Sequence, residues 1–241
     1  PLACGDYLDY RPTLQAASWI SRQQRCLNAG PWDEKLLWLC GSQALSSPVQ
    51  PVARAARWSA RMGGYHILRG PASWLMTRCG TYRDRPHQAD MLHVDLWYRG
   101  LNVLRDAGSF MYYHEDSRWQ HYFHSTAAHN TVEIDGVDQM IKGPRFLWFR
   151  WPAAHVISST GNDDASVLDM QSDSYAWLPQ PVTHRRSITR NGDTYTICDA
   201  LTSAGRHTAR VRWRLIDAPW CRHARDAHTW LTTVDGVSMS V

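Results

Sequence analysis

The stretch "RSITRNGDTYTICDAL", residues 186–201, decides the fold class. Two strand-like segments flank the dipeptide Asn191-Gly192. An Asn-Gly pair between such segments is a strong signal for a two-residue hairpin, because both residues tolerate positive φ. The stretch therefore predicts a β-hairpin with Asn191-Gly192 as a type I′ turn.

Extended patterns continue on both sides of this hairpin. In "HTARVRWRLI" (207–216), arginines alternate with Val211, Trp213 and Leu215, so one strand face is polar and the other apolar. Earlier segments divided by Gly, Asp and Asn turns are "GYHILRG" (64–70), "SWLMTRCG" (73–80), "DMLHVDLWYRG" (90–100), "LNVLRDAG" (101–108), "HNTVEIDG" (129–136), "FLWFRW" (146–151) and "AAHVISSTG" (153–161). No helical pattern separates them, so residues 63–241 are predicted to form an antiparallel β-sandwich.

Residues 1–62 have a different pattern. "RPTLQAASWISRQQRCL" (11–27) places apolar residues on roughly one helical face, and "GPWDEKLLWLCGSQAL" (30–45) predicts a second, shorter helix. Pro12 and Pro31 suit first turns. The Pro/Ser/Ala-rich segment 45–64 is predicted to be a linker. The predicted fold is thus mainly β, an antiparallel sandwich preceded by a short α-helical segment.

Composition excludes several classes of protein. The 241 residues are 44% hydrophobic and carry a net charge of +4, which is too small and dispersed to indicate nucleic-acid binding. The longest apolar runs, such as "KLLWLC" (35–40), are too short to span a bilayer. Six cysteines without C-x-x-C spacing argue against a zinc ribbon and favour buried free thiols, or one or two disulfides in an exported protein. Thirteen tryptophans suit either a carbohydrate binder or a sandwich core.

The chain starts at Pro1 and stops within a strand-like pattern, so we expect it to be a fragment of a longer protein. Its first residues therefore give no information about a signal peptide.

The stretch "TAAHNTVEIDGVDQ" (126–139) contains the first candidate site residue. His129 opens a predicted strand that ends at Asp135-Gly136, a hairpin-turn dipeptide. Core strands seldom open on a histidine and an asparagine. We therefore expect His129 to face a cleft that it shares with Asp106. The alternative is structural: Asp106 caps a turn through Gly108 or Ser109 while His129 donates to a carbonyl.

The block "DMLHVDLWYRGLNVLRDAGSFMYY" (90–113), followed by "STAAHNTVEIDGVDQM" (125–140), resembles the heparinase II/III family of polysaccharide lyases. The resemblance is to the β-sandwich that follows a helical toroid in that family. "VTHRRSI" (182–188) and "GRHTARVRWRLID" (205–217) also fit, and "CGDYLDYRPTLQAA" (4–17) looks like the end of the toroid. The resemblance thus implies that residues 1–62 are the C-terminal end of the toroid plus a linker.

The family cleaves acidic polysaccharides by β-elimination, so the resemblance implies a uronate-containing substrate and a periplasmic or cell-envelope location. A base removes the proton next to the uronate carboxyl, and positive groups must stabilise the carbanion. The toroid residues that usually serve there lie upstream of Pro1. The alternative function is a non-catalytic, carbohydrate-binding or structural sandwich.

The resemblance also implies a zinc site of His, Asp and His. Asp106 and His129 occupy two of these positions. Aligning the family's H-x-H-x-D segment on residues 86–90 puts Gln88 at the third and Pro86 at the position of a cleft histidine. An amide oxygen is a poor zinc ligand, and strand alternation places His87 and His93 opposite Gln88. We therefore expect zinc to bind weakly or not at all.

The candidate site residues fall into three groups. His129 and His93 are the candidate catalytic residues, and Asp106 and His129 the candidate metal ligands. His93 is predicted to share a sheet face with Asp95, as a structural or a cleft-facing pair. Candidate substrate-binding residues near the cleft rim, or able to grip a carboxylate, are His87, Gln88, Asp90 and Arg185.

Overall fold

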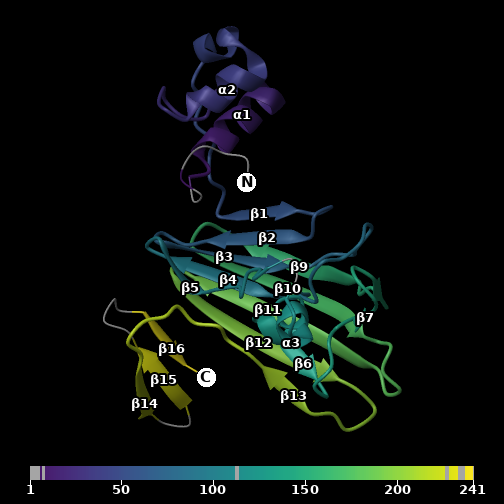
Figure 1. Cartoon of the computed structure of the whole chain (residues 1–241). Coiled ribbons are helices and arrows are strands. Elements are labelled where there is room, and N and C mark those ends of the chain that lie inside the picture. Colours follow the sequence, from purple (N-terminus) through teal and green to yellow (C-terminus); the bar gives the residue numbers. More distant parts are fainter. Residues whose placement is uncertain (1–5, 7–8, 112–113, 226–227, 233–236, 241) are drawn as a thin grey trace. The chain divides into compact units, whose positions relative to one another are not determined.

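The computed structural model describes residues 6, 9–111, 114–225, 228–232 and 237–240. The chain divides into two compact units, Pro1–Arg54 and Ala55–Val241. The first unit is helical and the second contains the sheets (Figure 1).

The helical unit consists of α1 (Arg11–Arg22), α2 (Asp33–Cys40) and a 3-10 helix, η1 (Ser42–Ser46). Both predicted helices are present but shorter than predicted, since Gln23 adopts a left-handed conformation after α1 and Gly41 ends α2. The buried side chain of Gln15 joins α1 to the rest of the unit. It donates to Leu27 O and to Asp33 Oδ1, at 3.0 and 2.7 Å, and its oxygen accepts the amide N–H groups of Cys26 and Leu27.

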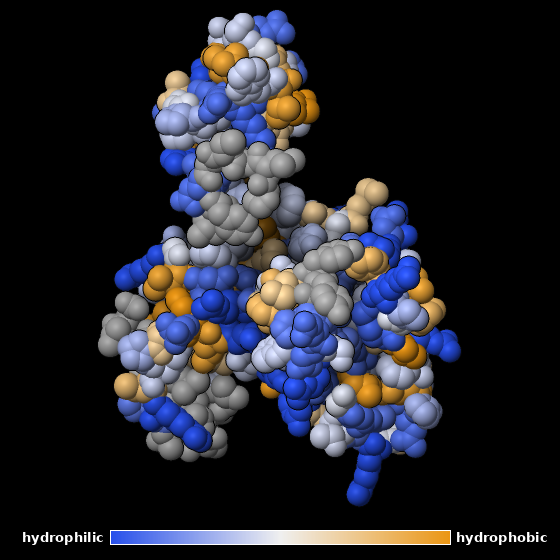
Figure 2. All heavy atoms as spheres, in the orientation of Figure 1, coloured by the Kyte–Doolittle hydropathy of each residue, from blue (hydrophilic) through white to orange (hydrophobic). Residues whose placement is uncertain are grey.

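Large apolar side chains are exposed on this unit, and Figure 2 shows several orange, hydrophobic patches on its visible face. Trp38 is 79% exposed, Leu39 62% and Ile20 61%. Apolar faces of this kind usually mark a surface that packs against other protein.

The second unit has two main antiparallel sheets. The first has the strand order β1 (Arg57–Ala60), β2 (Tyr65–Arg69), β3 (Ser73–Arg78), β4 (Val94–Tyr98) and β5 (Leu101–Leu104). The second has the order β12 (Thr194–Thr202), β11 (Val182–Asn191), β10 (Ala165–Tyr175) and β9 (Ala154–Gly161).

Shorter elements complete this unit. β6 (Val132–Ile134) pairs with β13 (Ala209–Val211), and β7 (Ile141–Lys142) pairs with β8 (Trp148–Phe149). β14 (Cys221–Arg225), β15 (His228–Thr232) and β16 (Ser238–Ser240) form a three-stranded sheet. The helix α3 (Ser117–Tyr122) and the 3-10 helix η2 (Thr126–Ala128) precede β6.

One hydrophobic core joins the two main sheets. Leu68 and Leu75 from the first sheet pack with Leu168, Met170 and Ile188 from the second. Alternate residues of β3 are buried, which is the expected pattern for a strand with one face on a core. The predicted antiparallel β-sandwich is confirmed, and α3, with 6 residues, is too short to contradict it.

Several strands differ from the prediction, and three of the differences affect the two main sheets. Arg57–Ala60 lies in the predicted linker but pairs with β2, so the sheet unit begins at Ala55, before residue 63. The predicted strand at 90–100 begins only at Val94, because Leu92 has a φ of 60°. The central strand β10 was not predicted, because buried Asp169 and Ser172 obscure its alternation.

The two predicted hairpin turns have different outcomes. Asp135 and Gly136 both have positive φ between the bridged residues Ile134 and Val137, as a type I′ turn requires. The later turn lies one residue further along than predicted. Asn191 pairs with Thr194, so Gly192 and the next residue form the loop.

The cysteines are free thiols wherever the structure describes them, but only Cys79 is buried. The prediction of buried thiols is therefore wrong for Cys198 and Cys221, which are exposed, while Cys4 lies outside the described residues. Among the described helices, none has the length and hydropathy needed to cross a membrane.

Candidate functional site

The carboxylate of Asp106 and the imidazole of His129 are in direct contact. His129 Nδ1 lies 2.6 Å from Asp106 Oδ2, although 23 residues separate the two in the chain. Asp106 follows β5 and His129 follows η2, so the polar segment between them returns the chain to the same place. Asp106 Oδ1 also accepts the amide N–H of Gly108 at 2.6 Å. The pair predicted as a site and the predicted turn cap thus coexist on one carboxylate.

His93 is the third member of this cluster. Its Nε2 lies 3.6 Å from Asp106 Oδ2, and its ring meets the His129 ring edge-on, with centroids 5.5 Å apart. The strand alternation predicted to place His93 opposite Gln88 does not hold here, because Leu92 has positive φ and β4 starts at Val94. The structure therefore brings His93 to Asp106 and His129.

Asn130 fixes the backbone around the cluster. Its side-chain nitrogen donates to the carbonyls of Val94 and Arg105, at 2.9 and 3.2 Å, next to His93 and Asp106 in sequence. Its side-chain oxygen accepts the amide N–H of Arg214 at 2.6 Å. The residue predicted as a strand opener thus ties together the segments that carry the cluster.

Arg186 supports the cluster from the second sheet, and the sequence did not reveal this role. The fully buried guanidinium donates to Leu92 O and Asn130 O, both at 2.7 Å, and makes a two-pronged ion pair with Asp199. Leu92 and Asn130 are the chain neighbours of His93 and His129. Strand alternation would have shown that Arg185 and Arg186 face opposite sides, but not which one faces inward.

Burial and charge set the protonation of the cluster. Burial, with the positive charge of His129, lowers the pKa of His93 to about 3, so this imidazole is neutral near pH 7. Burial alone would raise the pKa of Asp106, but the hydrogen bond and charge of His129 outweigh it, and that pKa falls below its usual range. The cluster therefore consists of an ionised carboxylate beside a neutral His93.

Asp90 lies near the cluster but has its own hydrogen-bond and ion-pair partners. It accepts a hydrogen bond from Tyr82 Oη at 2.9 Å, and Arg78 Nε lies 3.4 Å away. Burial raises its pKa, while the charges of Arg78 and His129 act against that change. Asp90 is thus held by its own chain and has little freedom to bind a ligand.

The other predicted substrate-binding residues are not brought into the cluster. His87 is exposed, and the side-chain oxygen of Gln88 is buried with no hydrogen-bond partner among the described residues. Arg185 lies on the outer face of β11, where it pairs with Asp169.

The distances between the donor atoms of His93, Asp106 and His129, and the lone pairs on those atoms, decide whether the three residues fit a zinc ion. The three offer ligand-type atoms within 4.8 Å of one another. Tetrahedral zinc ligands at 2.0–2.2 Å from the ion lie about 3.4 Å apart, whereas Asp106 and His129 are at hydrogen-bond distance. His93 Nδ1 accepts the amide N–H of Asn130 at 3.0 Å. A neutral His93 then carries its proton on Nε2 and has no lone pair left for a metal. The arrangement fits a hydrogen-bonded unit and does not fit a zinc site.

The same geometry gives His129 a defined chemical capacity. In its neutral form, His129 can donate from Nδ1 to Asp106 and then has a lone pair on Nε2. That nitrogen is buried and lacks a hydrogen-bond partner within the described part of the chain. Asp106 is the most open of the three, with 35% of its side chain exposed, against 1% for His129. His129 is therefore an oriented acceptor in a polar, mostly buried setting.

Comparisons with solved structures agree on the fold. The heparan sulfate lyase HepC from Pedobacter heparinus has a TM-score of 0.67 and 16% identity, over 96% of this chain and 33% of that protein. A mutant of HepC has a TM-score of 0.66 and 17% identity, over 96% of this chain and 34% of that protein. A heparinase III, the BT4657 gene product, has a TM-score of 0.64 and 16% identity, over 87% of this chain and 32% of that protein.

The chain therefore spans about a third of the length of these structures. No curated protein sequence matches it. The family model described as "Heparinase II/III-like, C-terminal" matches residues 53–239, which include both main sheets and the whole cluster. The chain thus belongs to the heparinase II/III family, of which it carries the C-terminal β-sandwich.

Proposed function

We propose that this chain is the sandwich part of a polysaccharide lyase that cleaves a uronate-containing acidic polysaccharide by β-elimination. The observation that carries the proposal is the 2.6 Å contact between His129 Nδ1 and Asp106 Oδ2, which leaves His129 Nε2 as a free acceptor. The similar structures include heparan sulfate lyases, which supports an anionic sugar polymer as the substrate class.

In this reaction, the C–H bond next to the uronate carboxyl and the bond to the glycosidic oxygen both break. The released electron pair forms a C=C bond, the departing oxygen takes up a proton, and no water is consumed. In its neutral form, His129 offers a lone pair on Nε2 that accepts a hydrogen bond or a proton from the substrate. Asp106 fixes the tautomer and stabilises the imidazolium if His129 gains that proton.

We further propose that zinc binds weakly or not at all. The reason is the donor chemistry of His93 and the hydrogen bond between Asp106 and His129, and neither depends on Gln88.

The test is turnover by the full-length protein on a panel of uronate polymers, followed by the ultraviolet absorbance of the unsaturated product. His129→Ala should abolish turnover. His207→Ala is a matched control, because His207 Nδ1 also lies 2.6 Å from a carboxylate, that of Asp135, away from the cluster. Equal turnover in the two variants would contradict the assignment of His129.

A non-catalytic sandwich is the second candidate, and the low exposure of His129 favours it, since a base must reach its substrate. In that case the full-length protein binds an acidic polymer, releases no unsaturated product, and binds equally well after His129→Ala.

A further inference from the structure

A second concave surface lies in the sheet unit, and none of its lining residues is His93, Asp106 or His129. It is a groove of about 890 Å³ along β1 and β9, which are the end strands of the two main sheets. This volume lies within the range of ligand-binding clefts in proteins.

The groove is positively charged. Arg57, Arg61 and Arg83 line it, against one carboxylate, that of Asp163. Among the described residues, none of these three arginines forms a salt bridge. A concave surface lined by charge of one sign concentrates ligands of the opposite sign, and guanidinium groups bind carboxylates and sulfates through paired hydrogen bonds.

The floor and walls of the groove are held in place by hydrogen bonds. His66 is buried at the floor, and its nitrogens contact Ser59 Oγ at 2.9 Å and Cys79 O at 3.1 Å. Burial, with the charge of Arg61, lowers the pKa of His66 and keeps it neutral. Arg57 donates across the groove to Ser159 Oγ at 3.5 Å. A ligand would therefore meet a preformed surface.

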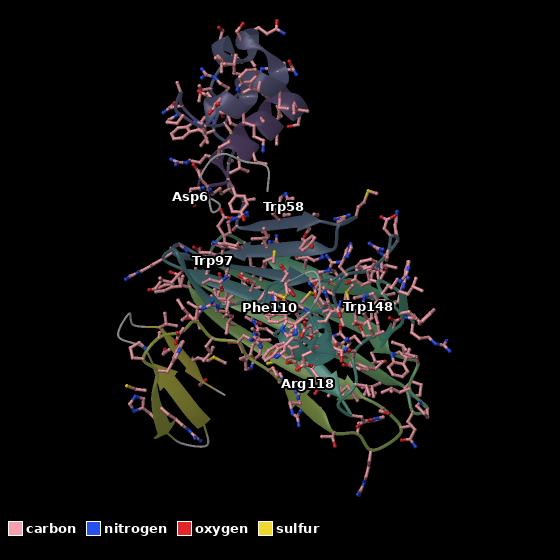
Figure 3. All side chains as sticks on the ribbon, viewed as in Figure 1. Asp6, Trp58, Trp97, Phe110, Arg118 and Trp148 are labelled. Atoms are coloured by element: carbon pink, nitrogen blue, oxygen red, sulfur yellow. The ribbon has the colours of Figure 1, made fainter. Side chains whose placement is uncertain are left out.

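An aromatic side chain lies beside the arginines. Trp58 on β1 lines the groove and is 49% exposed (Figure 3). The electron-rich face of an indole attracts the polarised C–H groups of a sugar ring. Cations together with one exposed indole suit an anionic sugar chain better than a small inorganic anion.

One segment of the chain separates the groove from the cluster. Thr81 and Arg83 line the groove, whereas Tyr82 between them contacts Asp90 beside the cluster. The groove and the surroundings of Asp90 thus share this segment of the chain.

We propose that this groove is a second binding site for an acidic polysaccharide, which holds the polymer while its cleavage point occupies the His129 site. The holding role rests on the proposed lyase function, but the binding role does not. Arg61 and Arg83 bind carboxylate or sulfate groups, and Trp58 packs on a sugar ring.

The experiment measures binding by the full-length protein carrying His129→Ala, so that no probe is consumed. The probes are fluorescent decasaccharides of heparin, alginate and polygalacturonate, with dextran as the uncharged control. Arg61→Ala/Arg83→Ala is compared with Arg206→Ala/Arg222→Ala, which removes the same charge from exposed positions outside the groove and the cluster. Trp58→Ala tests the stacking contribution.

We expect the Kd for at least one acidic probe to rise about tenfold in the groove variant, and to change less than about twofold in the control. Dextran should not bind to any of these proteins. Equal losses in the two double variants would overturn the proposal, because net charge alone would explain them. Failure of every acidic probe to bind would also overturn it.

Turnover separates this proposal from the lyase proposal. If the protein has no lyase activity but the groove variant loses binding, the second site stands and the lyase proposal fails. If turnover occurs, Arg61→Ala/Arg83→Ala in the otherwise native protein should raise KM for long polymers and leave kcat unchanged. An unchanged KM would remove the holding role.

Discussion

The two units of this protein differ in the kinds of side chain that they bury. The helical unit exposes large apolar side chains, such as Trp38, and buries the polar side chain of Gln15 between its elements. The sheet unit also exposes apolar side chains, such as Met62 and Phe110, but in addition it buries charges, and Arg186 and Arg190 are its largest fully buried side chains. Within the helical unit, its own described residues do not cover these apolar side chains, whereas among the described residues of the sheet unit every buried guanidinium has hydrogen-bond partners.

The difference shows how each unit relates to function. A buried charge is tolerated only when it is paired and hydrogen-bonded, so Arg186 constrains the segments that it contacts. An exposed apolar side chain constrains nothing within its own unit, but favours association with other protein. The sheet unit thus has the features of a site scaffold, and the helical unit those of a docking surface.

The largest effect is expected for Arg186→Met. This change leaves Asp199 without its guanidinium partner and Leu92 O and Asn130 O without donors, which should cost about 3–5 kcal/mol of unfolding free energy. Urea denaturation measures the loss. The control is Arg185→Met, because Arg185 is 54% exposed on the other face of β11, where water and salt screen its ion pair with Asp169. Similar losses in the two variants would show that burial of the charge has no special importance.

The second-largest effect is expected for acid, which should lower the unfolding free energy of the sheet unit. The pKa of His93 lies at about 3 in the fold and at 6.5 in the unfolded chain, and burial also lowers the pKa values of His66 and His184. The unfolded state therefore binds more protons below about pH 6.5, and stability falls as pH falls. His93 alone should lower the unfolding free energy by about 2 kcal/mol at pH 5.

The acid effect can be assigned to one unit, because residues 1–54 contain no histidine. Urea denaturation at pH 7 and pH 5, followed by circular dichroism of the sheet signal, provides the measurement. A chain that is equally stable at both values would argue against neutral, buried histidines.

A smaller effect is expected for Trp38→Gln in the helical unit. Trp38 is 79% exposed, so the unfolding free energy should change by less than about 0.5 kcal/mol. Any self-association of the chain should weaken, which sedimentation can measure. A large loss of stability would mean that Trp38 packs within its own unit, and the comparison between the units would fail.

The smallest effect is expected for zinc. If His93 has no lone pair for a metal and the N–H of His129 holds the carboxylate of Asp106, added zinc should leave the midpoint of thermal unfolding unchanged, since a ligand stabilises only through binding to the folded state. A rise of several degrees that His129→Ala removes would show that the cluster rearranges to hold the ion.

Local signals in the sequence predicted much of the fold and part of the site. The Asp135-Gly136 turn, the antiparallel sandwich and the contact between Asp106 and His129 follow from turn chemistry, alternation and family resemblance. Each depends on a pattern within a few residues or on a motif.

Features that depend on long-range packing were not predictable in this way. His93 reaches the cluster because Leu92 adopts positive φ. Non-glycine residues rarely have positive φ, so the sequence did not predict this conformation. The inward direction of Arg186 depends on carbonyls supplied by segments 94 and 56 residues away. The strand β10 was missed because its buried polar residues hide its period.

Asn130 has a consequence for the order of events during folding. Its amide group joins segments that lie 36, 25 and 84 residues from it in the chain. Contacts between distant segments form slowly, because the loops must close before the contacts stabilise them. The cluster of His93, Asp106 and His129 should therefore appear late, after the sheets have paired. A newly made chain would pass through a stage in which the sandwich is present and its chemistry is not.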